Sequence, residues 1–380
     1  MCSSDLGPDL GPRVTAAFAR EGANDAPSSH GDKRHGWPRI AAATLLSLAV
    51  AAATAWGGFL LGFQLPGPPL LRTTLIAIWC LLGAAACMAL SWRRLHAVRS
   101  PLLVVFAAGF AAVLALWFSL TPSHDRDWAD DVARLLDADV QGDHVVLRNV
   151  RNFEWRSETD YTPRWDTRGY DLTRLTTADL VLSYWMGPHI AHTLVSFGFN
   201  DGSRVVFSLE IRKERHESFS ALGGFFRRFE QVLVAADERD IIRTRSNIRG
   251  EDVSLYRLNV PPEALRKMFL GFVTQAQALQ RHPAFYNSLT SNCTTVVFDI
   301  ARHVAPRLPM DIRLLLSGHF AEYVYDQGGL TSDHTFAELQ TRAYINPRAL
   351  AVPADAVDET AFSRAIRQQV PGVPPAELVP

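Results

Sequence analysis

The stretch IAHTLVSFGFNDGSRVVFSLEIR, residues 190–212, contains the strongest local fold signal in the chain. Two apolar runs flank the tetrapeptide NDGS, and Asp-Gly between such runs is typical of a β-hairpin. We therefore expect two antiparallel strands here. If the loop is tight, His192 on the first strand lies opposite either Glu210 or Ile211 on the second. The sequence leaves this register open, and a slip of one residue would move Glu210 to the other face.

Further strands and helices are predicted around this hairpin without a regular alternation. DHVVLRNVRNFEWRS (143–157) and VSLYRLNV (253–260) favour strands, the first by its alternation of apolar and polar residues. PPEALRKMFLGFVTQAQALQRHP (261–283) predicts a helix, because Pro and Glu occupy its first turn and Pro follows its end. TPSHDRDWADDVARLL (121–136) predicts a short amphipathic helix after an initial turn. This irregular mixture indicates an α+β domain of about 250 residues.

The first third of the chain has a different composition from the rest. Residues 40–63, 73–92 and 101–120 contain no charged side chain. Each stretch has about the 20 residues that a helix needs to cross roughly 30 Å of hydrocarbon. A signal peptide accounts for one such stretch but not for three in succession. Buried helices of a soluble core are the alternative, and we predict three transmembrane helices within residues 40–120.

Basic residues give the orientation of these helices. Six of them lie within the ten residues before the first span or between the second and third: Lys33, Arg34, Arg39, Arg93, Arg94 and Arg99. The loop between the first and second spans has only Arg72. The positive-inside rule therefore predicts a cytoplasmic, disordered tail at 1–39 and an exported domain at 121–380.

Composition and motifs limit the partners and cofactors that we expect. The 380 residues include 38 Lys and Arg and 39 Asp and Glu, so no electrostatic feature favours nucleic acid as a partner. A phosphate-binding glycine loop and a dinucleotide fingerprint are both missing from the sequence, so we expect no cofactor. His189 and His192 would point to opposite faces of a strand, and we expect no metal site. The expected non-protein partners are the lipid bilayer and an unidentified envelope substrate.

The stretch YNSLTSNCTTVVFDIA, residues 286–301, contains a candidate nucleophile. The other cysteines are in the tail or the second span, so Cys293 has no disulfide partner within the exported domain. The preceding Asn and Ser residues favour a helix that begins near Cys293. The partial positive charge at such a helix end stabilises a thiolate. A buried thiol that only fills space remains the alternative.

Asn292 and Thr294 flank this cysteine, and two roles are compatible with this position: capping the helix and binding an oxyanion. Both residues are suited to capping the helix. The Asn292 side chain, or backbone N–H groups at this helix end, could instead bind a developing oxyanion. The sequence leaves both roles open.

A cysteine nucleophile needs a base within hydrogen-bonding reach, and His192 is our candidate. It is a lone polar ring in an apolar strand, where hydrogen-bonded core histidines are also common. Glu210 is the candidate third member, which would orient the imidazole and stabilise its charged form. The alternative for Glu210 is an edge-strand carboxylate paired with Arg212 or a nearby Lys. The segment DERD, residues 237–240, predicts a salt-bridge network with the following Arg243 and Arg245, and acid–base chemistry is its alternative.

Four motifs resemble the Lnb N-terminal periplasmic domain, a bacterial family. They are NFEWRSETDYTPRWDTRGYDL (152–172), HTLVSFGFNDGSRVVFSLEIRKE (192–214), ADERDIIRTRSNIR (236–249) and FYNSLTSNCTT (285–295). The resemblance extends over most of residues 140–350. It implies a periplasmic location for the exported domain and a bacterial inner membrane for the three spans, and it implies no particular reaction.

A fainter resemblance is to circularly permuted papain-like domains of the lecithin retinol acyltransferase type. Those proteins have a histidine on an early strand and, later, an Asn-Cys pair at the start of a helix. His192 precedes Asn292 and Cys293 in the same order. Glu210 is only an approximate match to the polar strand residue that follows the histidine in that pattern. The resemblance implies a permuted papain-like fold and a Cys–His enzyme.

Two functions of different classes follow from these patterns. The first is an inner-membrane-anchored cysteine hydrolase or acyltransferase, in which Cys293 attacks an amide or ester carbonyl of an envelope component and His192 activates the thiol. The second is a non-catalytic periplasmic sensing or scaffold domain, in which both side chains only pack. A third, weaker hypothesis is a partner protein in envelope assembly that binds through its arginine-rich strands.

Overall fold

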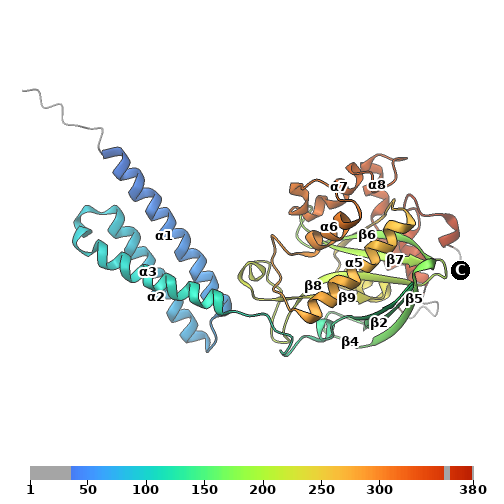
Figure 1. Ribbon diagram of the computed structural model, residues 1–380, viewed down its shortest axis with the longest axis horizontal. Helices are drawn as coiled ribbons and strands as arrows, with labels where there is room; N and C mark the ends of the chain where they lie inside the picture. Colours follow the sequence, from blue (N-terminus) through green and yellow to red (C-terminus); the bar gives the residue numbers. More distant parts are fainter. Residues whose placement is uncertain (1–35, 355–359, 379–380) are drawn as a thin grey trace, which may run out of the picture.

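The computed structural model describes residues 36–354 and 360–378, and it consists of three long helices followed by an α+β domain (Figure 1). This architecture confirms the predicted fold class. The predicted tail lies outside the described residues, apart from 36–39, where the first helix has already begun.

The three helices are α1 (Gly36–Gln64), α2 (Pro69–Ser91) and α3 (His96–Ser119), and each is long and apolar enough to cross a membrane. Figure 1 shows them side by side at one end of the molecule. Trp79 of α2 packs against Gly57 of α1, where a Cβ atom would lie 2.8 Å from the indole nitrogen. The same nitrogen donates a hydrogen bond to the Thr54 carbonyl at 2.8 Å. A polar group among apolar helices is therefore satisfied within the bundle.

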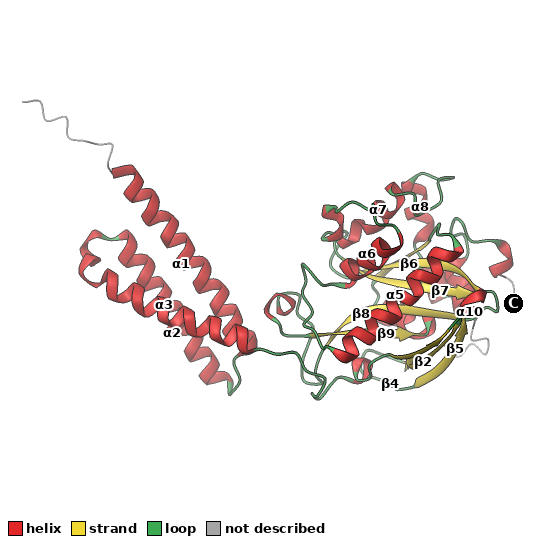
Figure 2. Ribbon diagram, viewed as in Figure 1, coloured by secondary structure: helices red, strands yellow, loops and turns green. Residues whose placement is uncertain are grey.

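The domain is built on an eight-stranded mixed sheet, shown in yellow in Figure 2. Its path runs β1-β2-β9-β8-β7-β6-β10, with β5 paired to β2, and the β2–β9 pair is parallel while the others are antiparallel. The strands are β1 (Asp137–Gln141), β2 (His144–Arg151), β5 (Trp165–Asp171), β6 (Leu175–Tyr184), β7 (Ala191–Phe199), β8 (Arg204–Arg212), β9 (Glu230–Ala236) and β10 (Asp252–Arg257). A second, two-stranded sheet pairs β3 (Glu154–Trp155) with β4 (Tyr161–Thr162).

Helices cover both faces of the large sheet. On one face, α5 (Pro262–Arg281) and α6 (Cys293–Val304) contribute to a core in which Phe207 stacks on Phe272 at 5.1 Å. A second core on the other face includes residues of α4 (Glu238–Arg243), α9 (Asn346–Leu350) and α10 (Ala361–Arg367). The remaining helices, α7 (Phe320–Asp326) and α8 (Phe336–Ala343), follow α6 along the chain. The helix predicted over 261–283 is confirmed as α5.

The helix predicted over 121–136 is wrong. The structure has only a 3-10 turn there, Asp130–Val132, and strand β1 begins at Asp137. The segment is extended because it bonds to the end of β8. The Ala129 N–H donates to the Lys213 carbonyl at 3.0 Å, and the Trp128 ring lies 4.4 Å from the Arg212 guanidinium. These tertiary contacts override the local helical pattern.

The predicted hairpin is confirmed, and its register is now defined. β7 and β8 pair from Leu194 with Ser208 to Gly198 with Arg204. Continuation of this register brings His192 level with Glu210 rather than with Ile211. β8 also pairs with β9 on its other side, so it is an interior strand of the sheet. The expectation that Glu210 lies on an edge strand is therefore wrong.

The acidic segment 237–240 takes part in an ion network, as predicted, but its partners are distant arginines and not Arg243 and Arg245. Asp240 accepts two hydrogen bonds from Arg151, at 2.8 and 3.0 Å. Glu238 bonds to Arg367 of α10, which also bonds to Asp179 of β6 and is fully buried. Opposite charges compensate one another in this network. It joins the C-terminal helix to the sheet.

Candidate active site

Helix α6 begins at Cys293, and Asn292 is its N-cap. The Asn292 carboxamide oxygen accepts hydrogen bonds from the backbone N–H groups of Thr294 and Thr295, both at 2.9 Å. Its Nδ2 atom donates to the Ser288 carbonyl at 2.9 Å. Both ends of this amide are thus occupied. Of the two roles open to Asn292, its contacts are those of the helix cap.

The Cys293 thiol lies where the pairing between β7 and β8 stops. The N–H of Thr193, one residue before the first β7–β8 pair at Leu194, donates to Cys293 Sγ at 3.5 Å. The hydroxyl groups of Thr193 and Thr294 bond to each other at 2.8 Å. Thr294 therefore ties the start of α6 to β7. Cys293 is 6% exposed.

His192 is held by two oxygen atoms from β8. Its Nε2 atom lies 3.1 Å from Glu210 Oε1 and 2.7 Å from Ser208 Oγ. The Ser208 hydroxyl donates to the same Glu210 oxygen at 2.7 Å. Glu210 is acceptor-only when ionised, so Nε2–H is the natural donor to it. The other ring nitrogen, Nδ1, is then left for the thiol.

Glu210 is bound by a second cation that the sequence analysis missed. Arg245, in the π-helical turn Thr244–Ile248, donates to Glu210 Oε1 at 2.8 Å. Arg245 also lies 3.3 Å from Glu251, so it bridges two carboxylates. The expected pairing of Glu210 with Arg212 is wrong. The Arg212 guanidinium instead donates to two backbone carbonyls, those of residues 132 and 133.

These contacts shift the pKa values of all three groups. Burial alone would lower the pKa of His192, but the Glu210 carboxylate and the Cys293 thiolate raise it to about 9. Burial would raise the pKa of Cys293, but His192 and the Thr193 N–H lower it to about 7. Burial is likewise outweighed at Glu210, whose pKa His192 and Arg245 hold well below its usual range. A thiolate and an imidazolium are therefore the favoured pair between about pH 7 and 9.

Tyr286 is a further group beside the thiol that sequence reasoning missed. Burial, followed by the charges of Cys293 and Glu210, raises the pKa of its phenol well above the usual range. Tyr286 also interacts with the backbone N–H of Cys293. The contact arises because Asn287 and Ser291 form a bridge that folds this loop back on itself. The signal available in the sequence is the presence of Tyr286 in the same short stretch as Cys293.

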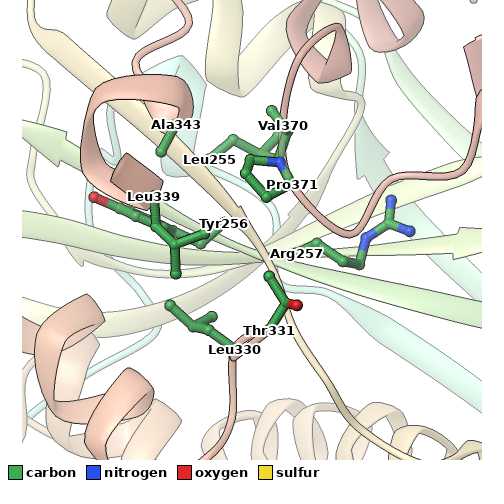
Figure 3. A pocket seen from close by; sticks show the side chains of 9 residues that line it. All are labelled: Leu255, Tyr256, Arg257, Leu330, Thr331, Leu339, Ala343, Val370 and Pro371. Carbon is green, nitrogen blue, oxygen red and sulfur yellow. The ribbon is translucent and has the colours of Figure 1, made fainter. Parts of the chain in front are cut away.

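Two cavities in the described domain lie apart from these residues. The first is lined by residues of β10, α8 and the C-terminal segment, and Figure 3 shows it. Its volume is about 10 Å³, roughly enough for one water molecule. The second has a volume of about 230 Å³ and is lined by mostly charged or aromatic residues, among them Asp130, Tyr161 and Arg215. Neither cavity is lined by Cys293 or His192.

Metal ligands do not cluster in the part of the chain that the structure describes. Within residues 36–354 and 360–378, no group of three His, Cys, Asp or Glu side chains is arranged to hold an ion. The Nδ1 atom of His189 lies 2.8 Å from Nε2 of His319, so the neighbour of His189 is a histidine other than His192.

Comparison with known proteins gives one positive result. No curated protein and no solved structure matches this chain. One family model matches residues 161–318, a segment that includes His192, Glu210 and Cys293. The description of that family agrees with the resemblance carried by the sequence motifs: residues 161–318 of this chain match the Lnb N-terminal periplasmic domain.

Proposed function

We propose that this protein is a membrane-anchored cysteine hydrolase or acyltransferase that acts on an amide or ester carbonyl of an envelope component. The observation that carries the proposal is the position of Cys293. It is the first residue of α6 and interacts with His192, whose Nε2 atom lies 3.1 Å from Glu210. A nucleophile, a base and an orienting carboxylate are the parts that this chemistry needs.

The reaction would proceed through an acyl-enzyme. The Cys293 thiolate attacks the carbonyl carbon, and a C–S bond forms. The tetrahedral intermediate then expels the alcohol or amine, which takes a proton from His192 as the C–O or C–N bond breaks. Neutral His192 next removes a proton from water or from a second alcohol or amine. This nucleophile attacks the thioester, the C–S bond breaks, and the acyl product leaves. Cys293 is released as the thiolate and His192 keeps the proton, which restores the resting pair.

The oxyanion would be stabilised at the N-terminus of α6. The carboxamide of Asn292 is occupied by the cap and by Ser288, so it is a poor candidate for this role. The backbone N–H of Cys293 and the Tyr286 hydroxyl are better candidates, because they already interact with each other beside the sulfur. A substrate oxygen that displaced the phenol from this N–H would gain both donors.

Access to the sulfur requires a local movement. Cys293 is 6% exposed, and a substrate carbonyl must approach Sγ directly. Tyr286 is only partly buried and belongs to the loop that leads into α6. We therefore propose that a shift of this loop opens the path, with the Tyr286 hydroxyl still beside the reacting carbonyl.

The location proposed for the domain is the periplasmic face of a bacterial inner membrane. Two independent observations support it. The basic residues lie on the side of the spans that includes the N-terminus, and three helices are long and apolar enough to cross a membrane. The matching family model describes a periplasmic domain. The three helices of this protein would hold the domain close to envelope substrates.

A non-catalytic sensing or scaffold domain is the second candidate. It is favoured by the low exposure of Cys293 and by the absence of this residue from the lining of both cavities described above. The two functions differ in what they require of the thiol. A scaffold needs only its volume, whereas an enzyme needs its nucleophilicity.

The decisive experiment is to trap the acyl-enzyme. The full-length protein would be isolated from bacterial membranes, quenched in acid, and the peptide containing Cys293 analysed by mass spectrometry. We expect an acyl mass on Cys293 that neutral hydroxylamine removes, and we expect Tyr286→Phe to change its steady-state amount. Cys87, in the second span, is the internal control and should remain unmodified. An unmodified Cys293 in every preparation, together with an ordinary pH profile for its alkylation, would favour the scaffold.

A further inference from the structure

The α+β domain follows the membrane helices along the chain, and it also contacts them through a short turn. This 3-10 turn, Gly223–Phe226, lies in the loop between β8 and β9. Phe226 packs into a cluster with Leu60 of α1 and Val113 of α3. The Gln64 side chain of α1 donates to the Phe226 carbonyl at 2.7 Å. The turn is thus anchored to two of the three helices.

These contacts define the depth of the turn. The Phe226 ring lies 5.6 Å from the rings of both Phe59 and Phe63. Phe59 precedes the end of α1 at Gln64 by five residues, or about 8 Å along the helix. Both phenylalanines belong to the candidate membrane span 40–64. Phe226 is therefore level with the last turns of this candidate span.

Arginine side chains at the same level have the geometry expected of a membrane interface. Arg227 lies 4.1 Å above the Trp117 ring of α3 and donates to its carbonyl at 2.8 Å. Arg228 lies 5.5 Å from the Phe63 ring. Tryptophan and arginine are enriched where apolar chains meet head groups, since each combines an apolar body with a polar tip.

Six exposed apolar side chains lie on this loop and on two loops that border it. They form what we term the apolar rim: Trp185, Met186, Phe219, Leu222, Phe225 and Leu289. Each is between 36% and 54% exposed. Their loops connect β6 to β7, β8 to β9, and α5 to α6. Large apolar side chains that gather in one region mark an interaction surface.

The three loops touch one another and surround the start of α6. The Trp185 ring lies 4.9 Å from Phe219, which joins the first loop to the second. Ser288 donates to the Ala221 carbonyl at 3.2 Å, which joins the second loop to the third. The third loop also contains Tyr286, the neighbour of the Cys293 thiol. The rim is therefore continuous with the membrane helices and with the loop that leads into the candidate active site.

We propose that the apolar rim inserts into the bilayer leaflet on the domain's own side. Its occupant is the same membrane that the three helices cross, because Phe225 and Leu222 adjoin a residue already level with the hydrocarbon. The loops then act as an interfacial anchor that is independent of the spans. As a result, the start of α6 faces the lipid–water boundary. This proposal concerns the position of the domain and does not depend on catalysis.

The test measures the depth of single positions in the full-length protein. The four native cysteines would be replaced, Cys293 by Ser, and one new cysteine introduced as Leu222→Cys or Phe225→Cys. Val140→Cys and Leu350→Cys are matched controls, since both residues are exposed and apolar but lie outside the three loops. Each protein would carry a nitrobenzoxadiazole label in nanodiscs of phosphatidylethanolamine and phosphatidylglycerol. Thermal melts matched to the unlabelled parent would verify that every variant is folded.

Quenching by two nitroxides distinguishes the outcomes. We expect lipids with a nitroxide near the head-group end of the acyl chain to quench the rim labels several-fold more than the control labels. A water-soluble nitroxide should give the opposite order. Equal accessibility of rim and control labels to the aqueous quencher would overturn the proposal. The labelled proteins lack the Cys293 thiol, so failure here would leave the proposed chemistry untouched.

Discussion

The Nε2 atom of His192 lies 3.1 Å from Oε1 of Glu210 across a point where two strands no longer pair. The register of the hairpin creates this contact, and the divergence of β7 and β8 leaves room for the start of α6. Glu210 is further fixed by Arg245. The imidazole is therefore held through its Nε2 atom by a carboxylate that is itself fixed. The following predictions test what this arrangement does to Cys293.

The first prediction concerns the pH dependence of Cys293. Because His192 lowers the pKa of the thiol to about 7, its alkylation by iodoacetamide should be half-maximal near pH 7. In His192→Ala the cation is gone and burial remains, so the midpoint should rise to about 8.5 or above. At pH 7 the thiolate fraction would then fall from about one half to about 3%. The alkylation rate at each pH is measured by quenching the reaction at fixed times and quantifying the Cys293 peptide by mass spectrometry. These rates give both midpoints.

Low accessibility does not confound this measurement. A buried thiol reacts slowly at every pH, but the midpoint of the profile still reports its pKa. A wild-type midpoint above pH 8 would contradict the thiolate–imidazolium pair. The same pair predicts that acyl transfer is fastest between about pH 7 and 9, where the thiol has lost its proton and His192 has kept one.

The second prediction isolates the charge of Glu210. Glu210→Gln keeps an oxygen that can accept from Ser208 but removes the carboxylate that raises the pKa of His192. His192 should then be largely neutral at pH 7, and the thiol midpoint should rise. We expect turnover to fall by about 10²-fold, the usual scale for a misplaced acid–base group.

Glu251→Gln is the matched control for this variant. Within the described residues, Glu251 lies 3.3 Å from the same Arg245 guanidinium and accepts from the Ser183 hydroxyl, so its partners are side chains other than His192. Its loss should leave the Cys293 midpoint where it is in the wild type. An equal rise in both variants would show that general disruption of the Arg245 region is responsible.

The third prediction separates capping from oxyanion binding at Asn292. Asn292→Ala removes the oxygen that accepts from two N–H groups at the start of α6, and it should destabilise the domain by about 1 kcal/mol. Asn292→Ser restores a cap but has no carboxamide. If Asn292 only caps, the serine variant should recover most of both stability and acyl-enzyme formation. Recovery of stability without activity would instead assign the amide a role in the reaction.

The sequence predicted those features that depend on local chemistry. Asp-Gly between apolar runs predicted the hairpin of β7 and β8, and the polar residues before Cys293 predicted a helix start at that cysteine. Stretches without charge predicted three helices suited to a membrane. In each case the deciding information lies within a few residues along the chain. The contact of His192 with Glu210 needed one more piece of information, the register.

Features that depend on distant segments could not be predicted in this way. Arg245 reaches Glu210 from 35 residues away through a π-helical turn, and nothing near either residue signals the pairing. Tyr286 meets Cys293 only because its loop folds back. The helix expected over 121–136 failed for the same reason, since bonds to the end of β8 replace those of a helix. Long-range contacts decided the first and the third, and the path of a single loop decided the second.

The fourth prediction distinguishes an enzyme from a scaffold. Cys293→Ser nearly preserves the size of the side chain and can still accept from the Thr193 N–H, so it should fold like the wild type. An enzyme should nevertheless lose its function, because a neutral hydroxyl is a much weaker nucleophile than a thiolate. Complementation of a deletion strain by both Cys293→Ser and Cys293→Ala gives the answer. Full complementation by the serine variant, at matched membrane abundance, would identify a packing role for the thiol.

The last prediction concerns the C-terminal helix. Arg367 is fully buried and bonds to Asp179 and Glu238, which belong to β6 and α4. Arg367→Met keeps most of the volume but leaves buried carboxylates without their shared cation. We expect a loss of about 3–5 kcal/mol in the free energy of unfolding, measured by urea titration of tryptophan fluorescence in nanodiscs.

Arg266→Met is the control, since its ion pair with Asp143 is at the surface, where the two side chains are 40% and 46% exposed. Its effect should be about 1 kcal/mol or less. In the fraction of Arg367→Met that remains folded, the Cys293 alkylation midpoint should stay near pH 7. The lost cation bonds to Asp179, Glu238, Ser196 and the Ser363 carbonyl, and these are not groups of the candidate site. A small loss of stability would show that Arg257 and Arg204 suffice to compensate Asp179. A shifted midpoint would show instead that α10 supports the geometry around the thiol through the sheet.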